Sequence, residues 1–290
     1  MGLTLQKLLD EAAERLKLAG VPDAGLDAKL LLFHVWNMSM TRWLLDRSRT
    51  VPEDQDGKVQ EYRRLVELRA SRIPLQHLTG SQEFMGLEFK VNEHVLIPRQ
   101  DTETLVELVM KENDLGGLSV LDMCTGSGCI AVSLAVLGGC GDVTGADISA
   151  EALAVANENA DRLCGDRSRI TFLESDLFES VPKDKKFDII VSNPPYIETD
   201  VISGLEPEVR DHEPVQALDG TEDGLYFYRR LAAECRSFLK PGGRVYFEIG
   251  CGQAEDVSGL LAEAGYTRIA TVKDLPGLDR VVCAVAGNNI

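Results

Sequence analysis

The sequence predicts an α/β protein in which a small N-terminal helical domain precedes a larger domain built on an open, mostly parallel sheet. Three observations lead to this prediction. The 290 residues are too many for one typical domain and too few for three. Apolar residues recur at helical spacing near the N-terminus, and short apolar runs alternate with helical patterns in the rest of the chain.

The helical domain is expected at residues 1–73, where apolar residues recur every three or four positions. Pro22 and Pro52 interrupt the pattern and separate the helical stretches. The last helix is expected at residues 55–72, because Pro74 ends it.

A β-hairpin linker is expected at residues 74–98, where the pattern changes to short alternating runs around Gly80 and Gly86. Its strand candidates are residues 87–91 and 95–97.

The larger domain is expected at residues 99–290, where strands and helices alternate along the chain. The strand candidates are residues 119–123, 142–146, 170–173, 187–192, 244–249, 267–271 and 280–285. The helix candidates are residues 129–137, 150–162, 224–239 and 253–264. This alternation predicts a sheet with helices on both faces, and such folds bind ligands beyond the carboxyl ends of the strands.

Composition and charge favour a cytoplasmic protein. The net charge of −17 disfavours a direct nucleic-acid substrate, because phosphates are bound mainly by Lys and Arg. The seven cysteines are an odd number without a C-x-x-C pair, which predicts reduced thiols and no metal site. No apolar run approaches the roughly 18 residues that span a bilayer, so no membrane partner is expected.

A strand-to-helix turn of small residues predicts a site for a ribose-bearing cofactor. The turn consists of Cys124, Thr125, Gly126, Ser127 and Gly128. Its glycines let the backbone turn tightly and approach a ligand closely. Asp147 closes the next strand, where a carboxylate can accept both hydroxyls of a ribose.

The turn alone leaves the cofactor open between S-adenosylmethionine and a nicotinamide dinucleotide. Residues 126–131 also satisfy the G-x-G-x-x-A pattern of nicotinamide-binding folds, so an oxidoreductase is one alternative. Asp122 before the turn and Asp147 after it favour S-adenosylmethionine.

The most specific signal is Asn193-Pro194-Pro195-Tyr196, at the carboxyl end of the apolar strand 187–192. Two consecutive prolines fix the backbone and remove two amide donors, so the carbonyl before Pro195 stays free to accept a hydrogen bond. Asn193 adds a side-chain carbonyl beside it. A planar NH2 group, on an amide or an adenine, offers two hydrogens that this pair of acceptors can hold.

Two acceptors on an NH2 group would activate a nitrogen that is otherwise a poor nucleophile. Its lone pair is delocalised, and holding both hydrogens favours localising it toward an electrophilic methyl. Tyr196 is expected to lie against the flat acceptor group and near the positive sulfonium, a contact of about 0.5 to 2 kcal/mol. The proton can leave after transfer, so no general base is needed. Asn193, Pro194 and Tyr196 are therefore the predicted catalytic residues.

Other functions and residues stay open on the residues alone. An adenine-N6 or other exocyclic-amine nucleic-acid methyltransferase is an alternative, because the same tetrapeptide serves such amines after base flipping. A binding module without catalysis would leave the proline motif unexplained. Glu213 and Glu248 either orient the substrate or satisfy buried partners. Arg99, Asp101 and Glu103 open a helix, as a capped helix start or as substrate contacts.

Several segments together resemble the release factor glutamine N5-methyltransferases, the HemK family, over nearly the whole chain. They are residues 95–103 and 193–196, Glu213-Pro214 with Ala217-Leu218, Asp223-Gly224-Leu225 with Tyr228-Arg229, and residues 279–282. The resemblance implies a seven-stranded, Rossmann-like class I S-adenosylmethionine-dependent methyltransferase domain. It also implies that the N-terminal helical domain helps to hold a release factor.

The resemblance further implies the roles of individual residues. The cofactor would be held by residues 124–128, Asp147, Asp176, Leu177 and Asn193. The target would be the glutamine of a Gly-Gly-Gln loop in peptide chain release factors 1 and 2, bound by residues 193–196. Methylation of that glutamine would place the enzyme in translation termination.

Three positions depart from the family's usual residues. Cys124 stands where glycine is usual, and a cysteine there predicts an ordinary backbone angle. Gln100 stands where proline is usual. Leu177 stands where an aromatic residue flanks the adenine.

Overall fold

The computed structural model describes residues 2–287 and consists of two compact units. The first unit contains the chain up to Gly80 together with Glu206–His212, and the second contains Ser81–Leu205 and the chain from Glu213 onward. Each unit has its own hydrophobic core.

The first unit is helical, as its apolar spacing predicts. Its helices are α1 (Leu5–Leu18), α2 (Ala24–Trp36), α3 (Met40–Asp46), α4 (Asp56–Ala70), α5 (Leu75–Thr79) and α10 (Pro207–Arg210), with a 3-10 turn η1 at Glu53–Gln55. The helix expected at 55–72 is therefore confirmed as α4. Leu8, Leu16 and Leu31 are buried between the helices, and the Tyr62 hydroxyl donates to the carbonyl of Ala28 at 2.9 Å.

Helix α10 comes from the later part of the chain and is held in the first unit by a buried ion-pair cluster. Glu208 accepts hydrogen bonds from Arg69 at 2.8 Å and from Arg72 at 2.6 Å. Arg69 also donates to Asp27 of α2 at 2.7 Å. The Arg69 side chain is only 6% exposed, so these carboxylates are its compensating charges.

The second unit begins with a two-stranded antiparallel hairpin of β1 (Ser81–Phe84) and β2 (Leu87–Lys90). Met85 and Gly86 turn the hairpin with φ angles of 53° and 73°, the left-handed pair that matches strand twist. The expectation of a strand at 95–97 is wrong. Val95 and Ile97 are buried, but this stretch pairs with no strand among the described residues.

The main sheet has seven strands, as predicted. They are β3 (Ser119–Met123), β4 (Asp142–Asp147), β5 (Ile170–Glu174), β6 (Phe187–Ser192), β7 (Leu239–Glu248), β8 (Tyr266–Lys273) and β9 (Asp279–Ala286). Their order is β5-β4-β3-β6-β7-β9-β8. The first five are parallel, and β9 pairs antiparallel with both β7 and β8.

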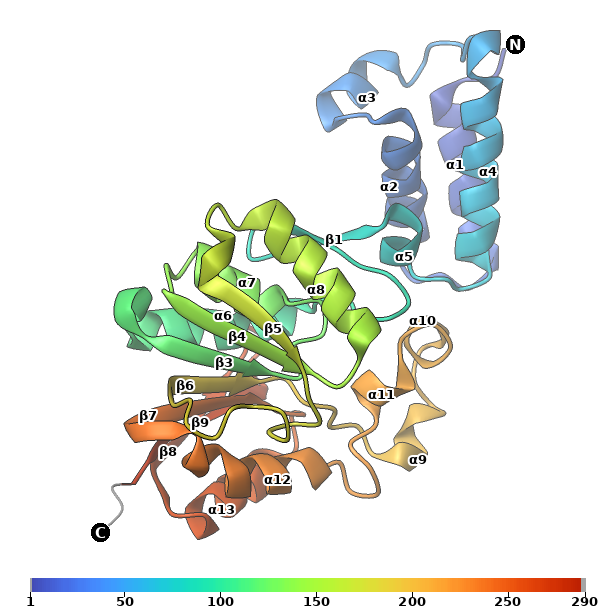
Figure 1. The fold of residues 1–290 in the computed structure, drawn as a ribbon. Helices are drawn as coiled ribbons and strands as arrows, with labels where there is room; N and C mark the ends of the chain where they lie inside the picture. The colour runs from blue at the N-terminus through green and yellow to red at the C-terminus, as the bar shows by residue number, and fades with distance from the viewer. Residues whose placement is uncertain (1, 288–290) are drawn as a thin grey trace. The chain divides into compact units, whose positions relative to one another are not determined.

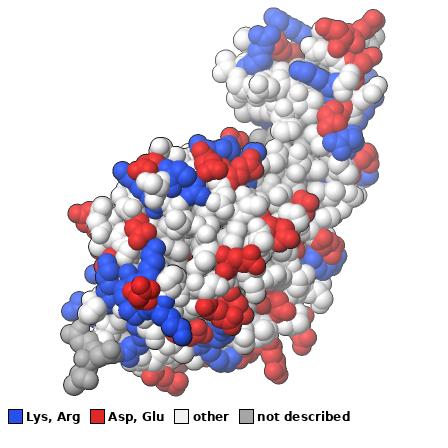
Figure 2. Space-filling view, viewed as in Figure 1, with Lys and Arg blue, Asp and Glu red and all other residues white. Residues whose placement is uncertain are grey.

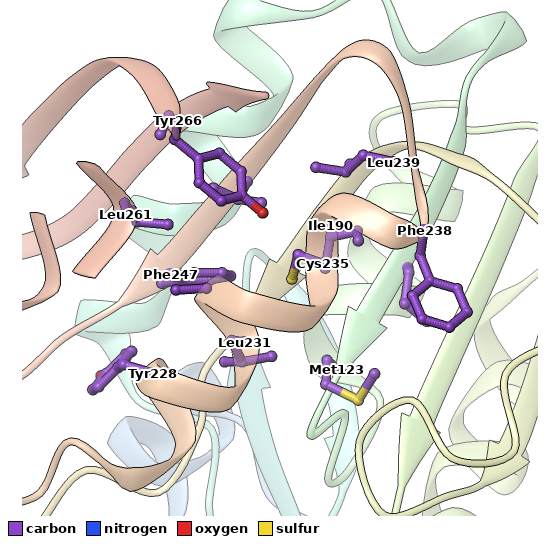
Figure 3. Close-up of a cluster of buried hydrophobic side chains, with 14 of the residues drawn as sticks. Met123, Ile190, Tyr228, Leu231, Cys235, Phe238, Leu239, Phe247, Leu261 and Tyr266 are labelled. Atoms are coloured by element: carbon purple, nitrogen blue, oxygen red, sulfur yellow. The ribbon is translucent and has the colours of Figure 1, made fainter. Parts of the chain in front are cut away.

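Helices cover both faces of this sheet (Figure 1). The core on one face includes residues of α6 (Gln100–Glu112), α7 (Cys129–Val136) and α8 (Ala150–Leu163). The core on the other face includes residues of α12 (Tyr226–Glu234) and α13 (Ala254–Glu263). Figure 3 shows the core beneath α12 and α13, where Leu231 and Leu261 lie with Phe247 of β7.

The helix expected at 224–239 is wrong at both ends. Gly224 has a φ of 69° and precedes α12. After Glu234 the chain passes through a 3-10 turn, η4 (Cys235–Ser237), and Leu239 already belongs to β7. The 3-10 turn and the start of β7 continue the apolar pattern, so periodicity alone does not mark the helix end.

Short helical pieces complete the unit. They are η2 (Leu115–Gly117), η3 (Arg167–Arg169), α9 (Thr199–Ile202) and α11 (Val215–Leu218). Between residues 2 and 287, no helix has both the length and the apolar composition that crossing a bilayer requires. Figure 2 shows acidic and basic side chains interspersed on the visible face.

Candidate active site

A cavity of about 340 Å³ lies in the second unit, beyond the carboxyl ends of β3, β4 and β6. The strand order reverses direction between β3 and β6, the place where open α/β sheets bind ligands. Both predicted motifs reach this cavity. Its lining includes Cys124, Thr125, Gly126, Ser127, Asp147, Asp176, Leu177, Asn193 and Pro195. Gly128, Pro194 and Tyr196 are adjacent in sequence but do not line it.

The turn after β3 has a left-handed backbone at three positions. Cys124, Gly126 and Gly128 have φ angles of 61°, 53° and 76°. The expectation of an ordinary angle at Cys124 is therefore wrong. Here the tight passage from strand to helix, and not the side chain, decides the backbone conformation.

The two glycines of the turn serve different purposes. A Cβ atom added to Gly128 would lie 3.1 Å from the Cβ of Ala156 in α8, whereas one added to Gly126 would meet nothing within 4 Å. Gly128 therefore allows α7 and α8 to approach closely. Gly126 lines the cavity and leaves its backbone open to a ligand.

Asp147 at the end of β4 supports the turn. One of its carboxylate oxygens accepts from the amide of Gly126 at 2.8 Å, and the other accepts from the amide of Ser149 at 3.0 Å. Burial raises the pKa of this carboxyl, while the amide donors oppose the shift. The same carboxylate lines the cavity, where it can accept further hydroxyl donors.

Asp122 lies behind the turn and holds it in place. Its Oδ2 accepts from the Thr125 hydroxyl at 2.6 Å and from the Ala131 amide at 3.1 Å. Its Oδ1 is buried without a hydrogen-bond partner in the described chain. Burial raises the pKa of Asp122 to about 7, because the charged form is poorly solvated there.

The turn after β5 brings Asp176 and Leu177 to the cavity. Leu177 has a φ of 46° and is buried. Asp176 accepts a hydrogen bond from Arg230 of α12 at 2.6 Å. Arg230, together with Tyr226 and Phe227, also lines the cavity. These three residues were not predicted, although they begin directly after Asp223-Gly224-Leu225, one of the segments that carries the resemblance.

The proline motif follows β6 and meets α6 and β7. The Asn193 amide nitrogen donates to the Thr102 hydroxyl at 3.3 Å. The Tyr196 hydroxyl donates to Glu248 at 3.5 Å, and burial raises the pKa of Glu248 to about 7. The Tyr196 carbonyl accepts from Gln253 at 3.1 Å. Thr102 and Gln253 were not singled out in the sequence, because each reaches the motif across a long separation in the chain.

The charged residues at the start of α6 are paired within the second unit. Arg99 lines the cavity and donates to both oxygens of the buried Glu213 at 2.7 Å. Asp101 forms an ion pair with Arg280 at 3.1 Å. Glu103 accepts from the amide of Met85 at 2.6 Å. Contacts within the chain account for Asp101 and Glu103, whereas Arg99 also lines the cavity.

Known proteins resemble the chain over nearly its full length. Residues 7–80 match the family model described as PrmC N-terminal domain, and residues 114–257 match a methyltransferase domain. A release factor glutamine methyltransferase of Caulobacter vibrioides is 42% identical over 98% of this chain and 97% of its own. The one from Geobacter sulfurreducens is 41% identical over 96% and 95%. The chain belongs to the release factor glutamine methyltransferase family.

Solved structures agree on the fold of this family member. A methyltransferase from Pyrococcus furiosus has a TM-score of 0.52 at 19% identity, and covers 70% of this chain and 91% of its own. A ribosomal protein L11 methylase from Lactobacillus delbrueckii subsp. bulgaricus has a TM-score of 0.50 at 22% identity over 71% and 90%. The methyltransferase fold and the enzyme class are thus confirmed, and S-adenosylmethionine is the cofactor. The oxidoreductase alternative falls with this assignment.

Proposed function

We propose that this methyltransferase transfers a methyl group from S-adenosylmethionine to the side-chain amide nitrogen, N5, of the glutamine in the Gly-Gly-Gln loop of peptide chain release factors 1 and 2. Family membership and the local geometry support the proposal. We infer a cytoplasmic reaction in translation termination, consistent with seven free cysteines. The net charge of −17 disfavours a direct nucleic-acid substrate.

The cavity fits the cofactor in size and in the chemistry of its lining. About 340 Å³ is within the usual range for small-molecule sites. We assign cofactor contacts to Cys124, Thr125, Gly126, Ser127, Asp147, Asp176, Leu177 and Asn193, which line the cavity. Gly128, predicted with them, is assigned a packing role instead. The open backbone at Gly126 and the Asp147 carboxylate are the two strongest supports, because they offer a close approach and a ribose acceptor in one place.

Aromatic side chains in the cavity compensate for Leu177, which has no ring to stack on an adenine. Tyr226 and Phe227 of α12 both line the cavity. Their rings form an edge-on pair with centroids 5.1 Å apart. We propose that they contribute the aromatic contact with the adenine.

We assign the glutamine amide to Asn193, to the carbonyl of Pro194 and to Pro195, whereas Tyr196, predicted with them, supports the shape of the motif. One observation carries this assignment: Asn193 and Pro195 line the same cavity as Gly126 and Asp147. The Asn193 oxygen and the carbonyl before Pro195 are the two acceptors for the hydrogens of the substrate NH2 group. Bound S-adenosylmethionine supplies an electrophilic methyl group.

The chain's part in the reaction is to orient the amide and to polarise it. Two fixed acceptors favour a localised lone pair on the nitrogen and stabilise the positive charge that develops there. Tyr196 does not line the cavity, so we assign it a supporting role in the shape of the motif. No general base is assigned, because the methylated nitrogen is acidic enough to release its proton.

The decisive experiment measures methyl transfer from labelled S-adenosylmethionine to purified release factors 1 and 2. Release factors with Gln→Ala in the Gly-Gly-Gln loop are the negative control. DNA and tRNA are offered as competing acceptors. Label only on the unmutated factors supports the proposal, and label on nucleic acid contradicts it. Asn193→Ala should abolish transfer. Asn113→Ala should leave it intact, because Asn113 caps the C-terminal end of α6 and does not line the cavity.

A further inference from the structure

Gln253, the residue directly before α13, joins three backbone segments through its side chain. Its amide nitrogen donates to the carbonyl of Tyr196 at 3.1 Å and to the carbonyl of Gly224 at 3.2 Å. Its amide oxygen accepts from the backbone nitrogen of Gly250 at 3.0 Å. The side-chain amide therefore has two acceptors for its two N–H bonds and one donor for its oxygen.

These partners also fix the orientation of the Gln253 amide. A carbonyl can only accept and a backbone N–H can only donate. Turning the amide over would place its oxygen against two carbonyl oxygens and its N–H bonds against the amide of Gly250. A glutamate has the same shape but no donor when it is ionised, so only glutamine satisfies all three partners.

Two glycines allow the chain to lie directly against Tyr196. A Cβ atom added at Gly220 would lie 2.7 Å from the Cα atom of Tyr196, and one added at Gly224 would collide with the Tyr196 carbonyl oxygen. Backbone hydrogen bonds hold the next residue as well. The amide of Ile197 donates to the carbonyl of Leu218 at 3.0 Å, and the amide of Gly220 donates to the carbonyl of Ile197 at 2.8 Å.

The proline motif is therefore held at both of its ends. At the near end, Ser192 of β6 pairs with Met123 of β3 and its hydroxyl donates to the Met123 carbonyl at 2.7 Å. Between the two ends, the rings of Pro194 and Pro195 lock two φ angles. The Pro194 carbonyl, one of the two proposed acceptors for the substrate NH2 group, lies within this restrained stretch.

We propose that Gln253 is a positioning residue, which clamps the carboxyl end of the proline motif and so fixes the direction of the Pro194 carbonyl toward the substrate nitrogen. This role rests on the proposed function, in which that carbonyl accepts a hydrogen bond from the glutamine amide. Gln253 does not line the cavity, so it acts through the motif. Gly220 serves the same purpose, because it leaves room for Tyr196.

The first test replaces Gln253 by glutamate. We expect Gln253→Glu to lower kcat for release factor methylation about tenfold or more, because the carboxylate repels two carbonyls and shifts the motif. KM for S-adenosylmethionine and the dissociation constant of S-adenosylhomocysteine should change little. Gln82→Glu is the matched control and should keep full kcat. Gln82 also donates to a backbone carbonyl, that of Glu83 at 2.7 Å, but does not line the cavity.

The second test separates positioning from stability. Gly220→Ala would crowd Tyr196, whereas a Cβ atom added at Gly243 of β7 would lie 2.9 Å from the Leu239 side chain and 3.0 Å from the Lys240 carbonyl, which do not line the cavity. Both Gly220→Ala and Gly243→Ala should lower the melting temperature. Only Gly220→Ala should lower kcat, again about tenfold.

Full kcat in Gln253→Glu would overturn the inference, whatever Gly220→Ala shows. So would an equal loss of kcat in Gly220→Ala and Gly243→Ala, because lost stability would then explain the effect. If Gln253→Glu does not fold, the comparison of the two alanine variants decides. Failure of the unsubstituted enzyme to methylate release factors would instead refute the proposed function, and the role of Gln253 would fall with it.

Discussion

At the scale of single residues, Cys124 holds a backbone conformation that its side chain disfavours. A left-handed angle costs a residue with a Cβ roughly 1–2 kcal/mol, and the φ of Cys124 is 61°. The thiol is placed among buried groups, and burial raises its pKa well above the usual range. It therefore stays a neutral thiol at physiological pH.

A β-branched residue at this position should be destabilising. We predict that Cys124→Val lowers the free energy of unfolding by about 1–2 kcal/mol relative to Cys124→Gly. Thermal melts of the two variants measure the difference. Cys164→Val is the control, because Cys164 has an ordinary φ of −83°, and equal effects at both sites would contradict the strain at Cys124.

Glu248 should make stability depend on pH. Burial raises its pKa from the ordinary glutamate value of 4.5 to about 7 in the folded protein, so the folded state binds the proton more tightly than the unfolded state. This contribution is fully present below about pH 4.5 and is lost as the pH rises through about 7. The difference in melting temperature between Glu248→Gln and the unsubstituted protein should therefore shift in favour of the variant when the pH is raised from 5 to 8.

Melting temperatures measured at pH 5 and pH 8 test this directly. Glu112→Gln serves as the control, because Glu112 is partly exposed. A gap between Glu248→Gln and the unsubstituted protein that is the same at both pH values would contradict the raised pKa.

In the turn between β3 and α7, one glycine allows close helix packing and another leaves room for a ligand. Gly128→Ala should lower the melting temperature more than Gly126→Ala, because only a Cβ atom added at Gly128 would crowd neighbours, lying 3.1 Å from Ala156 and 3.3 Å from Phe172. Gly126→Ala should weaken S-adenosylmethionine binding about tenfold or more, because its Cβ would enter the cavity. Melts and calorimetric titration measure the two effects, and the reverse ranking would refute this division of roles.

The seven strands of the main sheet were predictable because each contains a short apolar run next to a turn signal. Strand β1 was missed, because three of its four residues are polar or charged. The bounds of β3 and β6 match the expected residues, since both strands are buried along their length. Elements that depend on tertiary contacts were harder to predict from the sequence. The helix α5 was missed, because Pro74 was read only as a helix end, whereas it also begins the next helix.

The site was predictable where local backbone chemistry shapes it. The turn at 124–128 and the motif at 193–196 were visible because glycines and prolines have fixed conformational consequences. Thr102, Arg230 and Gln253 are ordinary residue types brought to the site by α6, α12 and the start of α13. No local pattern marks such contacts before the fold is known.

At the scale of the whole molecule, Glu208 ties a late segment of the chain to the helical unit. We predict that Glu208→Ala lowers the melting temperature of the helical unit and exposes 206–212 to proteolysis, because Arg69 and Arg72 lose a shared partner. Glu206→Ala is the matched control, since the Glu206 side chain is 72% exposed. Equal cleavage rates in the two variants would contradict this role.

The place of 206–212 within the first unit has a consequence for exchange between relatives. A chimera that swaps only the first 80 residues would pair one protein's arginines with another protein's Glu208 segment. Recombination that preserves this unit must therefore carry two stretches of the gene together, so the boundary at Gly80 is a poor place for a single crossover.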